Sequence, residues 1–574
     1  MCGVVGYTGK QQAAPILLHG LAKLEYRGYD SAGLCVGSET GLSTVKARGK
    51  LKNLSELTND GATLPGVCGI GHTRWATQGD PTDANAHPHV SWSGRFAVVH
   101  NGIIENFRKL KEFLVSVGVK FMSETDTEVV AQLIDYYYKG DVLEAVREAV
   151  QALEGYYALG IISTEMPGAL IAARKDSPLI VAQAEGESFF ASDVTAFMNY
   201  TRDVIYLDDE EIAVLTSEGI TYYNEYGQKI EKEVHRVDWD ADAAQKGGYA
   251  HFMLKEIYEQ PKVCRDTVSP RIQNGEINLE DAKIDSEFFK DVSKIVILAC
   301  GSAYHSGISG KYWLEKYARI PTEAVLASEF RYADPIVDSK TLAIVISQSG
   351  ETADTLAALR EAKRLGAKTL AIVNVRGSSI TREAERTLYI NAGPEIAVAT
   401  TKAYTAQLAA LTLIALTAAK QRGTIAESDY SAIVTELIEL PDKMQKTLDL
   451  TGELTQYLST LYFNHVSVFF IGRNLDYAAS LEASLKLKEI SYIHAETYAA
   501  GELKHGTISL IEEGTLVVAV AAHTKLLDKL ESNIAEVKAR GAEVLCLTQE
   551  SGVDTMSEGS DKLVTVPDVH EALT

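Results

Sequence analysis

The sequence predicts a multidomain α/β protein, and three observations lead to this prediction. The chain has 574 residues, which is too many for one hydrophobic core. About the first 240 residues alternate many short predicted strands with a few helices. From about Ser293 onwards, short apolar runs alternate with helical stretches, which is typical of a parallel sheet with crossover helices.

The first third of the chain is expected to hold mixed α/β structure. Its predicted strands are residues 3–7, 33–36, 96–100, 158–163, 170–174 and 212–216. Its predicted helices are residues 12–26 and 127–138. A charged, glycine-bearing stretch, residues 238–248, is interpreted as a linker, and a helical segment over residues 251–267 follows it.

The rest of the chain contains an internal duplication. The first copy has predicted strands at residues 295–299, 342–347 and 369–373, and the second has matching segments at 469–474, 516–521 and 544–548. In both copies the helix before the last of these strands ends in Lys-x-x-Gly-Ala. The copies lie about 170 residues apart throughout, so we interpret them as two doubly wound units. Such sheets bind ligands beyond the carboxyl ends of their strands.

The charge balance argues against a nucleic-acid-binding function. Lys and Arg total 55 against 78 for Asp and Glu, a net charge of −23. A nucleic-acid surface would need basic patches that neutralise phosphates. An anionic substrate must therefore be held locally by backbone NH groups and hydroxyls, because the overall field repels it.

The six cysteines suggest neither a disulfide framework nor a zinc site, and we expect no metal and no cofactor. The first residues carry no signal-peptide pattern. The most apolar long stretch, residues 406–419, is too short to span a bilayer and is expected to form a buried helix. We therefore expect a cytoplasmic protein with reduced thiols.

Cys2 follows the initiator methionine, which makes it a candidate nucleophile. Removal of Met1 would leave a thiol and a free α-amine on one residue. A terminal amine titrates at about pH 8, so a fraction of it is neutral at neutral pH and can act as the base for its own side chain. A lone cysteine near a strand start could equally be an ordinary small residue, so the surrounding motifs must decide between these two interpretations.

Three motifs favour the nucleophile. In His-Thr-Arg-Trp-Ala-Thr (72–77), the Arg74 guanidinium can clamp a carboxylate. In His-Asn-Gly (100–102), which follows an apolar strand, the Asn101 side chain and the Gly102 NH can form an oxyanion hole. Ser-Glu-Thr-Asp-Thr-Glu (123–128) precedes a helix and is expected to cap it, a role that can coexist with ligand binding.

These motifs resemble the N-terminal-nucleophile glutaminase domains of class II amidotransferases. The matching segments are residues 2–6, 27–31, 71–77, 85–89, 100–106 and 123–128. The resemblance implies an αββα sandwich in which Cys2 attacks the amide of glutamine, and Asn101 and Gly102 stabilise the oxyanion. It further implies the glutamine-binding residues: Arg74 for the α-carboxylate, Asp126 for the α-ammonium, Thr77 and His87 in the lining, and Trp75 as a gate for ammonia. A structural role also remains open for His87, because a histidine next to proline in a loop is often structural.

A hydroxyl-rich turn follows the predicted strand 342–347. Ser347, Ser349 and Thr352, together with Gln348 and the NH groups of the following helix, are expected to cradle a phosphate. A serine-rich turn alone is more often a simple helix cap. Its place after a strand favours the phosphate, as does the loss of most hydroxyls from the corresponding turn of the second copy, residues 521–524.

This half of the chain resembles the sugar isomerase (SIS) fold in duplicate, and the whole chain resembles the glutamine–fructose-6-phosphate aminotransferase family. The segments that carry the second resemblance are residues 299–304, 327–332, 347–352, 485–496 and 501–506. It implies transfer of the amide nitrogen of L-glutamine to D-fructose 6-phosphate and isomerisation to D-glucosamine 6-phosphate, with release of glutamate. Ammonia would be channelled between domains, in the first step of the hexosamine pathway.

The resemblance also implies roles in the second half. Glu489 matches the base that moves a proton between C1 and C2, and Lys486 matches the lysine that assists at the substrate hydroxyls. His505 matches the ring-opening histidine, a role that suits a group titrating near neutral pH. It would reach the site from the partner subunit, so a homodimer is implied. The sugar site should be lined by Ser302, Val398 and Thr400.

The expected domains are residues 1–240 (glutaminase), 241–290 (linker and helical segment), 291–430 (first SIS domain) and 455–574 (second SIS domain). Alternatives remain open: a phosphosugar sensor without catalysis, which would not require Cys2 and Glu489, and a bare glutaminase. Without the family, Glu482 and Lys486 could be only an i,i+4 surface pair.

Three departures from the family pattern stand out. Thr400 and Ala303 stand where the family often or sometimes has serine, which could alter one hydrogen bond each to the sugar. The family also continues for a few dozen residues beyond residue 574, through a lysine that forms an imine with the opened sugar. We therefore expect this form to keep its glutaminase and sugar-phosphate binding but to couple them poorly.

Overall fold

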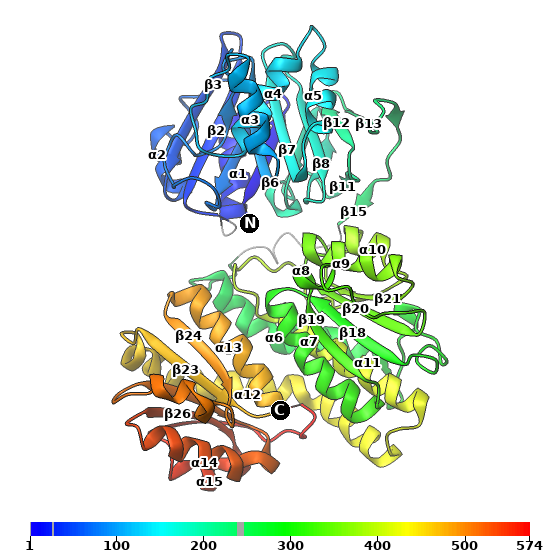
Figure 1. The fold of residues 1–574 in the computed structure, drawn as a ribbon, viewed down its shortest axis with the longest axis vertical. Helices are drawn as coiled ribbons and strands as arrows, with labels where there is room; N and C mark the ends of the chain where they lie inside the picture. The colour runs from blue at the N-terminus through cyan, green and yellow to red at the C-terminus, as the bar shows by residue number, and fades with distance from the viewer. Residues whose placement is uncertain (1, 26–27, 238–245, 574) are drawn as a thin grey trace. The chain divides into compact units, whose positions relative to one another are not determined.

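The computed structural model describes residues 2–25, 28–237 and 246–573 (Figure 1). The chain forms two compact units, Met1–Gln245 and Lys246–Thr574, which we call the first and the second unit. The interpreted linker, residues 238–248, lies almost entirely outside the described residues, as do Met1 and Arg27.

The first unit contains two antiparallel sheets. One has the order β15-β11-β9-β10-β1-β4-β2-β3, and the other β14-β13-β12-β8-β7-β6-β5. The strands of the first sheet are β1 (Gly3–Thr8), β2 (Ser31–Ser38), β3 (Gly41–Arg48), β4 (Cys68–Arg74), β9 (Ile180–Ala184), β10 (Glu187–Ala191), β11 (Asp203–Tyr206) and β15 (His235–Arg236). Those of the second are β5 (His89–Val90), β6 (Phe96–Ile104), β7 (Gly155–Ser163), β8 (Leu170–Lys175), β12 (Ile212–Leu215), β13 (Ile220–Tyr223) and β14 (Lys229–Ile230).

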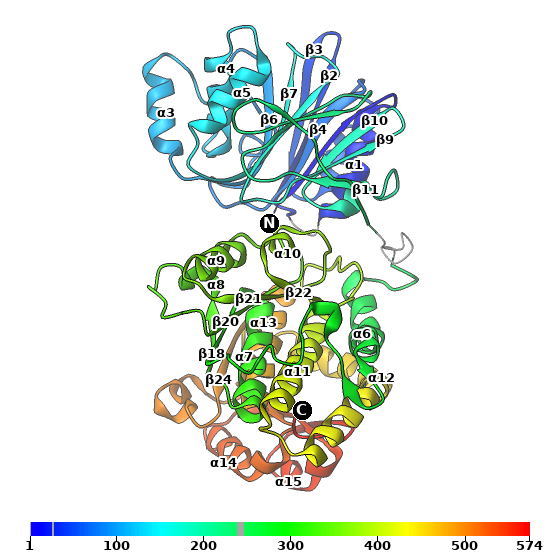
Figure 2. The same cartoon turned by 90° about the vertical axis from the view of Figure 1, so that its right-hand side faces the viewer.

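Helices cover the outer faces of these two sheets (Figures 1 and 2). The helices α1 (Ala13–Leu24) and α2 (Leu51–Leu57) pack on the eight-stranded sheet. The helices α3 (Phe107–Ser116), α4 (Thr127–Tyr137) and α5 (Val142–Gln151) cover the seven-stranded one. A third apolar cluster, which includes Val4, Val99 and Phe190, joins the two sheets. The unit is therefore the predicted αββα sandwich. Each predicted strand overlaps an observed one, and their ends differ by up to about four residues, most at β6.

The second unit contains two parallel five-stranded sheets, in the orders β19-β18-β20-β21-β22 and β24-β23-β25-β26-β27. Their strands are β18 (Lys294–Ala299), β19 (Thr322–Leu326), β20 (Thr341–Ser347), β21 (Lys368–Val373), β22 (Arg386–Tyr389), β23 (Ser467–Gly472), β24 (His494–Ala499), β25 (Leu516–Ala521), β26 (Glu543–Gln549) and β27 (Lys562–Val566). Because the strands follow the same spatial order in both sheets, the predicted duplication is confirmed. A short hairpin, β16 (Ile272–Gln273) and β17 (Glu276–Ile277), precedes them.

Helices lie on both faces of these sheets. Because successive residues of a strand point to opposite faces, a strand that is buried on both sides contributes to two apolar clusters. In β20, Ile344 belongs to one apolar cluster and Val345 to another. The helices are α6 (Phe252–Val268), α7 (Gly301–Trp313), α8 (Ala327–Phe330), α9 (Ala353–Arg364), α10 (Ser379–Glu383), α11 (Lys402–Arg422), α12 (Glu427–Tyr462), α13 (Leu475–Ser491), α14 (Leu527–Lys538) and α15 (Val553–Ser557). The predicted buried helix over residues 406–419 is the middle of α11.

The helix α12 was not predicted. It runs for 36 residues and fills the stretch that the sequence left unassigned between the two copies. Pro441 lies inside it, and an internal proline normally argues against a continuous helix. None of the helices in the described ranges is both long and apolar enough to cross a membrane.

Candidate functional site

Cys2 lies at the entrance to β1, beside the end of β4. The Trp75 backbone NH donates a hydrogen bond to Sγ of Cys2 at 3.2 Å, and Sγ lies 3.6 Å from the Trp75 carbonyl oxygen. Burial raises the pKa of the Cys2 thiol, although the hydrogen bond from Trp75 acts in the opposite direction. The thiol is therefore held in place but neutral, and it needs a base when it attacks.

Asn101, near the end of β6, faces Cys2 across the two sheets. Its Nδ2 donates to the Cys2 carbonyl oxygen at 2.8 Å. Its Oδ1 lies 3.0 Å from Nε2 of His72, which also lies 3.1 Å from the His100 carbonyl oxygen. Because both partners of this nitrogen are acceptors, Nε2 must carry the proton. His72 thus fixes which end of the Asn101 amide points to Cys2.

His72 is a positioning residue that the sequence did not single out. It is buried, and burial lowers its pKa to about 3, so it stays neutral at physiological pH. Its ring stacks on that of His87 at 4.1 Å between centroids, and His89 and His100 are buried nearby. The sequence did carry one sign of this cluster: four of the 13 histidines of the chain lie between residues 72 and 100.

Gly102 adopts a backbone conformation that excludes other residues. Its φ is +140°, and a Cβ atom there would lie 2.0 Å from the Tyr156 carbonyl oxygen of the paired strand β7. Only glycine fits at this point of the ladder, directly beside Asn101.

Arg74 is buried at the end of β4, with 4% of its surface exposed. Its guanidinium donates to the backbone carbonyl oxygens of Gln78, Gly79 (3.1 Å) and Asp80 (3.4 Å). In the described part of the chain it forms no ion pair with a carboxylate. A buried cation that is held only by carbonyl groups can accept an anion without first losing a partner.

Asp126 begins α4, but it does not cap the helix as expected. Its side chain accepts no capping hydrogen bond from a backbone NH of the first turn, although Oδ1 accepts one from the Thr127 hydroxyl at 3.4 Å. Oδ2 instead accepts from the Ile104 NH of β6 at 2.9 Å. Glu128 accepts from the NH groups of Met122 and Ser123, at 2.8 and 2.6 Å, and so holds the turn before the helix. The Asp126 carboxylate is thereby turned towards the strand that carries Asn101.

The other predicted glutamine-site residues lie on the segment between β4 and β5. The Trp75 indole is 42% exposed and packs edge-on against Tyr29 at 5.3 Å. Thr77 is exposed in the loop after β4. His87 is buried, and its Nδ1 accepts from the His100 NH at 3.3 Å, which is the structural role that the sequence left open.

In the second unit, the hydroxyl-rich turn lies at the carboxyl end of β20 and leads into α9. The Ser347 hydroxyl accepts from the Gly350 NH at 3.0 Å and lies 3.0 Å from the Thr352 hydroxyl. Ser349 accepts from the Glu351 NH at 3.2 Å. No side-chain hydrogen bond of Gln348 is found in the described residues. The turn is thus braced by Ser347, at the N-terminus of a 12-residue helix, where an anion is favoured.

A chain of charged side chains joins the two copies at this edge. Lys486 of α13 donates to the hydroxyl of Ser302 on α7 at 3.0 Å and pairs with Glu489 at 2.5 Å. Glu482 pairs with Lys486 at 3.2 Å and with Nδ1 of His305 at 2.8 Å. Glu482 is only 6% exposed, so the interpretation as a surface pair is wrong. His305 is a second contributor that the sequence did not reveal.

The chain matches two families of known domains. Residues 72–199 match the glutamine amidotransferase domain family, and residues 288–417 and 461–573 match the SIS domain family. A glutamine--fructose-6-phosphate aminotransferase [isomerizing] from Clostridium tetani is 54% identical over 99% of this chain and 93% of its own length. One from Thermus thermophilus is 48% identical over 100% and 94%. This chain belongs to the glutamine–fructose-6-phosphate aminotransferase family.

A solved structure agrees with this membership for the second unit. The C-terminal domain of glucosamine-fructose-6-phosphate aminotransferase from Francisella tularensis is 39% identical to this chain. Its TM-score is 0.54, over 57% of this chain and 92% of that domain. This aminotransferase-family chain therefore carries both a glutamine amidotransferase domain and two SIS domains.

Within this family chain, the remaining predicted sugar-site residues lie on the loop before α11. Val398 is 57% exposed. The Thr400 hydroxyl donates to Glu395, which also accepts from the NH groups of Thr401 and Ala403, at 3.0 and 3.1 Å. Glu256 of α6 accepts from the NH groups of Ile396 and Ala397, at 2.6 and 3.1 Å, from the other side. The carboxylates of Glu395 and Glu256 thus hold the backbone of this loop in place by accepting hydrogen bonds from its NH groups.

His505 is not brought to the other sugar-site residues. It lies exposed on a short turn, Leu503–His505, and its side chain makes no hydrogen bond or ion pair with any residue that the structure describes. Lys486 and Glu489 are therefore assembled within one chain of this aminotransferase-family member, whereas His505 is not.

Proposed function

We propose that this protein transfers the amide nitrogen of L-glutamine to D-fructose 6-phosphate and isomerises the product to D-glucosamine 6-phosphate. The observations that carry the proposal are the pairing of Cys2 with Asn101 in the first unit and the serine-braced helix start in the second unit. We assign the glutaminase to residues 1–240 and the synthase to residues 291–430 and 455–574. The reaction would take place in the cytoplasm.

In the glutaminase half, Arg74 would bind the α-carboxylate of glutamine and Asp126 its α-ammonium group. The thiol of Cys2 would then attack the amide carbon, with its α-amine as base once Met1 is removed. Negative charge develops on the amide oxygen in the transition state, where Nδ2 of Asn101 and the NH of Gly102 would stabilise it. Thr77 and His87 would complete the lining, and Trp75 would gate the ammonia.

In the synthase half, the turn of Ser347, Gln348, Ser349 and Thr352 would bind the phosphate at the start of α9. Glu489 would move the proton between C1 and C2 after ammonia has joined the ketone. Lys486, which contacts both Ser302 and Glu489, would hold the substrate hydroxyls at this point. Val398 and Thr400 would close the sugar site.

A direct test measures both products in one tube. The purified chain is incubated with glutamine and fructose 6-phosphate, and glutamate and glucosamine 6-phosphate are quantified. We expect both products, each dependent on glutamine. Glutamate without amino sugar would contradict the synthase half alone, and the absence of both products, in protein shown by mass spectrometry to lack Met1, would contradict the whole proposal.

Two variants separate the halves. Cys2→Ser should abolish glutamine-dependent formation of both products. Glu489→Gln should leave glutamate formation within about twofold of wild type and abolish the amino sugar, because it removes only the base of the second reaction. Glu453→Gln, an exposed carboxylate on α12, serves as the control and should change neither.

We also infer a homodimer in which His505 opens the sugar ring in the partner's site. Its exposure, and the lack of a hydrogen bond or ion pair from its side chain to any described residue, support this arrangement. When inactive Glu489→Gln and His505→Ala chains are mixed under conditions that exchange subunits, activity should recover towards about one quarter of wild type. If a mixture that has exchanged subunits stays inactive, sharing of His505 is excluded.

A further inference from the structure

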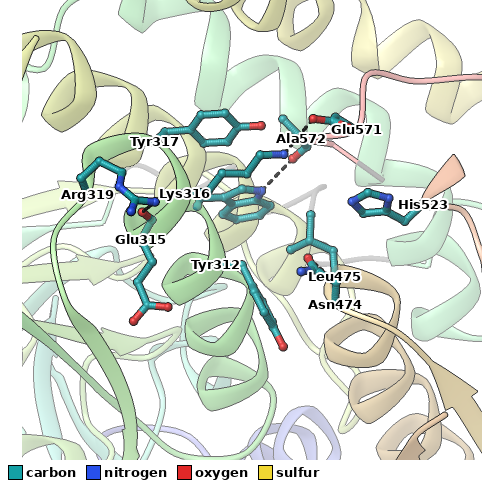
Figure 3. Close-up of a pocket in the computed structure, with 11 residues that line it drawn as sticks. Tyr312, Glu315, Lys316, Tyr317, Arg319, Asn474, Leu475, His523, Glu571 and Ala572 are labelled. Carbon is teal, nitrogen blue, oxygen red and sulfur yellow. Dashed lines mark hydrogen bonds and ion pairs between the residues drawn. The ribbon is translucent and has the colours of Figure 1, made fainter. Parts of the chain in front are cut away.

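The two copies of the duplicated fold contact each other through the helices α7 and α13. Nδ1 of His305 on α7 lies 2.8 Å from Oε2 of Glu482 on α13. Figure 3 shows Tyr312 of α7 and Leu475 of α13, seven residues after His305 and seven before Glu482, lining one cavity. The two helices are therefore antiparallel, because residue numbers rise along one as they fall along the other. Since residues seven apart lie on nearly the same face of a helix, His305 and Glu482 lie within one continuous contact between the copies.

The orientation of the Glu482 carboxylate depends on His305. Because an ionised carboxylate can only accept hydrogen bonds, Nδ1 of His305 must carry the proton that it donates to Oε2. The other oxygen, Oε1, is buried and accepts no hydrogen bond among the described residues, although Nζ of Lys486 lies 3.2 Å away. The bond from His305 is thus the directed contact that holds this carboxylate.

The same contact helps to keep Glu482 charged. Burial raises the pKa of the Glu482 carboxyl, but the hydrogen bond from His305 and the positive charge of Lys486 outweigh this effect, so that its pKa lies below the ordinary value. A buried carboxylate is stable in its ionised form only while such partners are in place. Loss of the His305 donor would therefore weaken both the orientation and the charge of Glu482.

Lys486 lies between two carboxylates of different exposure. Its Nζ is 2.5 Å from Oε2 of Glu489 and 3.2 Å from Oε1 of Glu482. The side chain of Glu489 is 33% exposed, whereas that of Glu482 is 8% exposed. When Glu489 takes up the substrate proton, as proposed above, it becomes neutral and Lys486 loses one of its two charged partners. A largely buried ammonium group without a charged partner is unfavourable, so the second carboxylate must then hold it.

We propose that His305 is a positioning residue for the isomerisation, which holds Glu482 as the permanent counterion of Lys486 while the charge of Glu489 changes. The inference rests on the function proposed above. His305 acts through Glu482 and takes no part in the proton transfer itself. Its removal should therefore slow the reaction without weakening the binding of the sugar phosphate.

Two substitutions of His305 test this role. His305→Leu removes the donor and should lower kcat for amino-sugar formation about tenfold, with KM for fructose 6-phosphate and the rate of glutamate formation within about twofold of wild type. His305→Asn should restore kcat to within about threefold of wild type. The amide nitrogen of asparagine is as many bonds from Cα as Nδ1 of histidine, so it can donate to Glu482 from nearly the same place.

A double variant shows whether His305 acts through Glu482. Glu482→Gln keeps the shape of the side chain but removes its charge, and should lower kcat at least as much as His305→Leu. In the double variant, His305→Leu should add less than about a twofold further loss, because the group that it positions is no longer charged. His465→Leu, at a half-buried histidine between α12 and β23, is the control and should change neither kcat nor KM.

The outcomes separate this inference from the proposed function. Losses of kcat that multiply in the double variant, or a His305→Asn variant as slow as His305→Leu, would overturn the role of His305 as a donor to Glu482. A His305→Leu variant as active as an active wild type would overturn this inference alone. If the wild type forms no amino sugar, the proposed function fails and this inference fails with it.

Discussion

At the scale of single residues, the glutaminase site depends on a histidine that does no chemistry. His72 donates from Nε2 to Asn101, and so sets the direction of the amide that faces Cys2. His72→Phe keeps a planar aromatic ring, although a somewhat larger one, and removes this donor. We expect kcat for glutamine hydrolysis to fall about tenfold to hundredfold, less than for loss of an oxyanion donor itself, with KM changed by less than about threefold.

The control for this prediction is His89→Phe. His89 is buried in the same cluster but contacts Thr125 rather than Asn101. The His89→Phe variant should therefore have a lower free energy of unfolding, and its kcat for glutamine hydrolysis should stay within about threefold of wild type. Equal losses of kcat in both variants would mean that His72 acts only through packing.

Gly102 gives a second residue-scale prediction. Gly102→Ala places a Cβ 2.0 Å from the Tyr156 carbonyl oxygen, at a φ of +140°. Strand β6 must then shift, so glutaminase kcat should fall at least a hundredfold, while fructose 6-phosphate binding to the second unit is unchanged. Gly94 also has a positive φ, but a Cβ atom there would meet nothing within 4 Å. Normal activity of Gly94→Ala would therefore show that the loss in Gly102→Ala comes from the contact with the Tyr156 carbonyl oxygen.

Sequence motifs could identify most of these residues but not their partners. Cys2, Arg74 and Asn101 stand in recognisable motifs, because their chemistry restricts which residue types can serve. The contacts of His72 and of Asp126 depend on how β6 lies beside β4 and before α4. Since a capping carboxylate and a ligand-binding carboxylate look the same in a sequence, the motif at residues 123–128 left both roles open, and the side chain of Asp126 makes no capping hydrogen bond.

At the scale of elements, the turn between β20 and α9 is where the phosphate site can be tested. The Ser347 hydroxyl braces this turn from within through Gly350 and Thr352. Ser347→Ala should raise KM for fructose 6-phosphate at least tenfold and leave the glutaminase intact. Ser328→Ala, on the short helix α8, is a matched control, because the Ser328 hydroxyl donates to its neighbour Glu329 at 3.2 Å and to no other side chain among the described residues. An unchanged KM for Ser347→Ala would remove this turn from the sugar site.

Elements were predicted best where they are most buried. The strands β18 and β20 are mostly continuous apolar runs, so their ends were predicted to within one residue. The strand β6 runs four residues beyond its predicted end, because it continues through the polar residues His100 and Asn101. The edge strand β15 is only two residues long and is polar and partly exposed, and it pairs with β11, about 30 residues earlier in the chain, so the local sequence gives little sign of it. The helix α12 was missed because Pro441 and Gly452 interrupt its pattern.

At the scale of the whole molecule, the two units should respond oppositely to acid. In the first unit, burial lowers the pKa values of His72, His87, His89 and His100. The unfolded chain then binds more protons, so stability is lost as pH falls below about 6.5. Each histidine can cost up to about 2 kcal/mol by pH 5, at about 1.4 kcal/mol per pH unit.

In the second unit, burial raises the pKa values of Glu256 and Asp476 to about 7. The folded state then binds more protons than the unfolded chain, so the contribution of these two carboxyl groups to the free energy of unfolding grows as pH falls below 7. The lowered pKa of His523 has the opposite effect. Scanning calorimetry at pH 7.5 and 5.5 should show the transition of the first unit falling further than that of the second. Asp476→Asn should narrow this difference, and equal shifts of both transitions would contradict the prediction.

The 36-residue helix α12 fixes both the separation and the relative rotation of the two copies of the duplicated fold. Each residue of an α-helix advances the chain by about 1.5 Å and turns it by about 100°. A single inserted residue in α12 would therefore rotate the entire second sheet relative to the first and separate Lys486 from Ser302. Seven inserted residues would nearly restore the rotation, since they make almost two full turns, but they would still displace the second sheet by about 10 Å along the helix axis. The length of this helix should therefore be fixed by the Lys486–Ser302 contact at 3.0 Å.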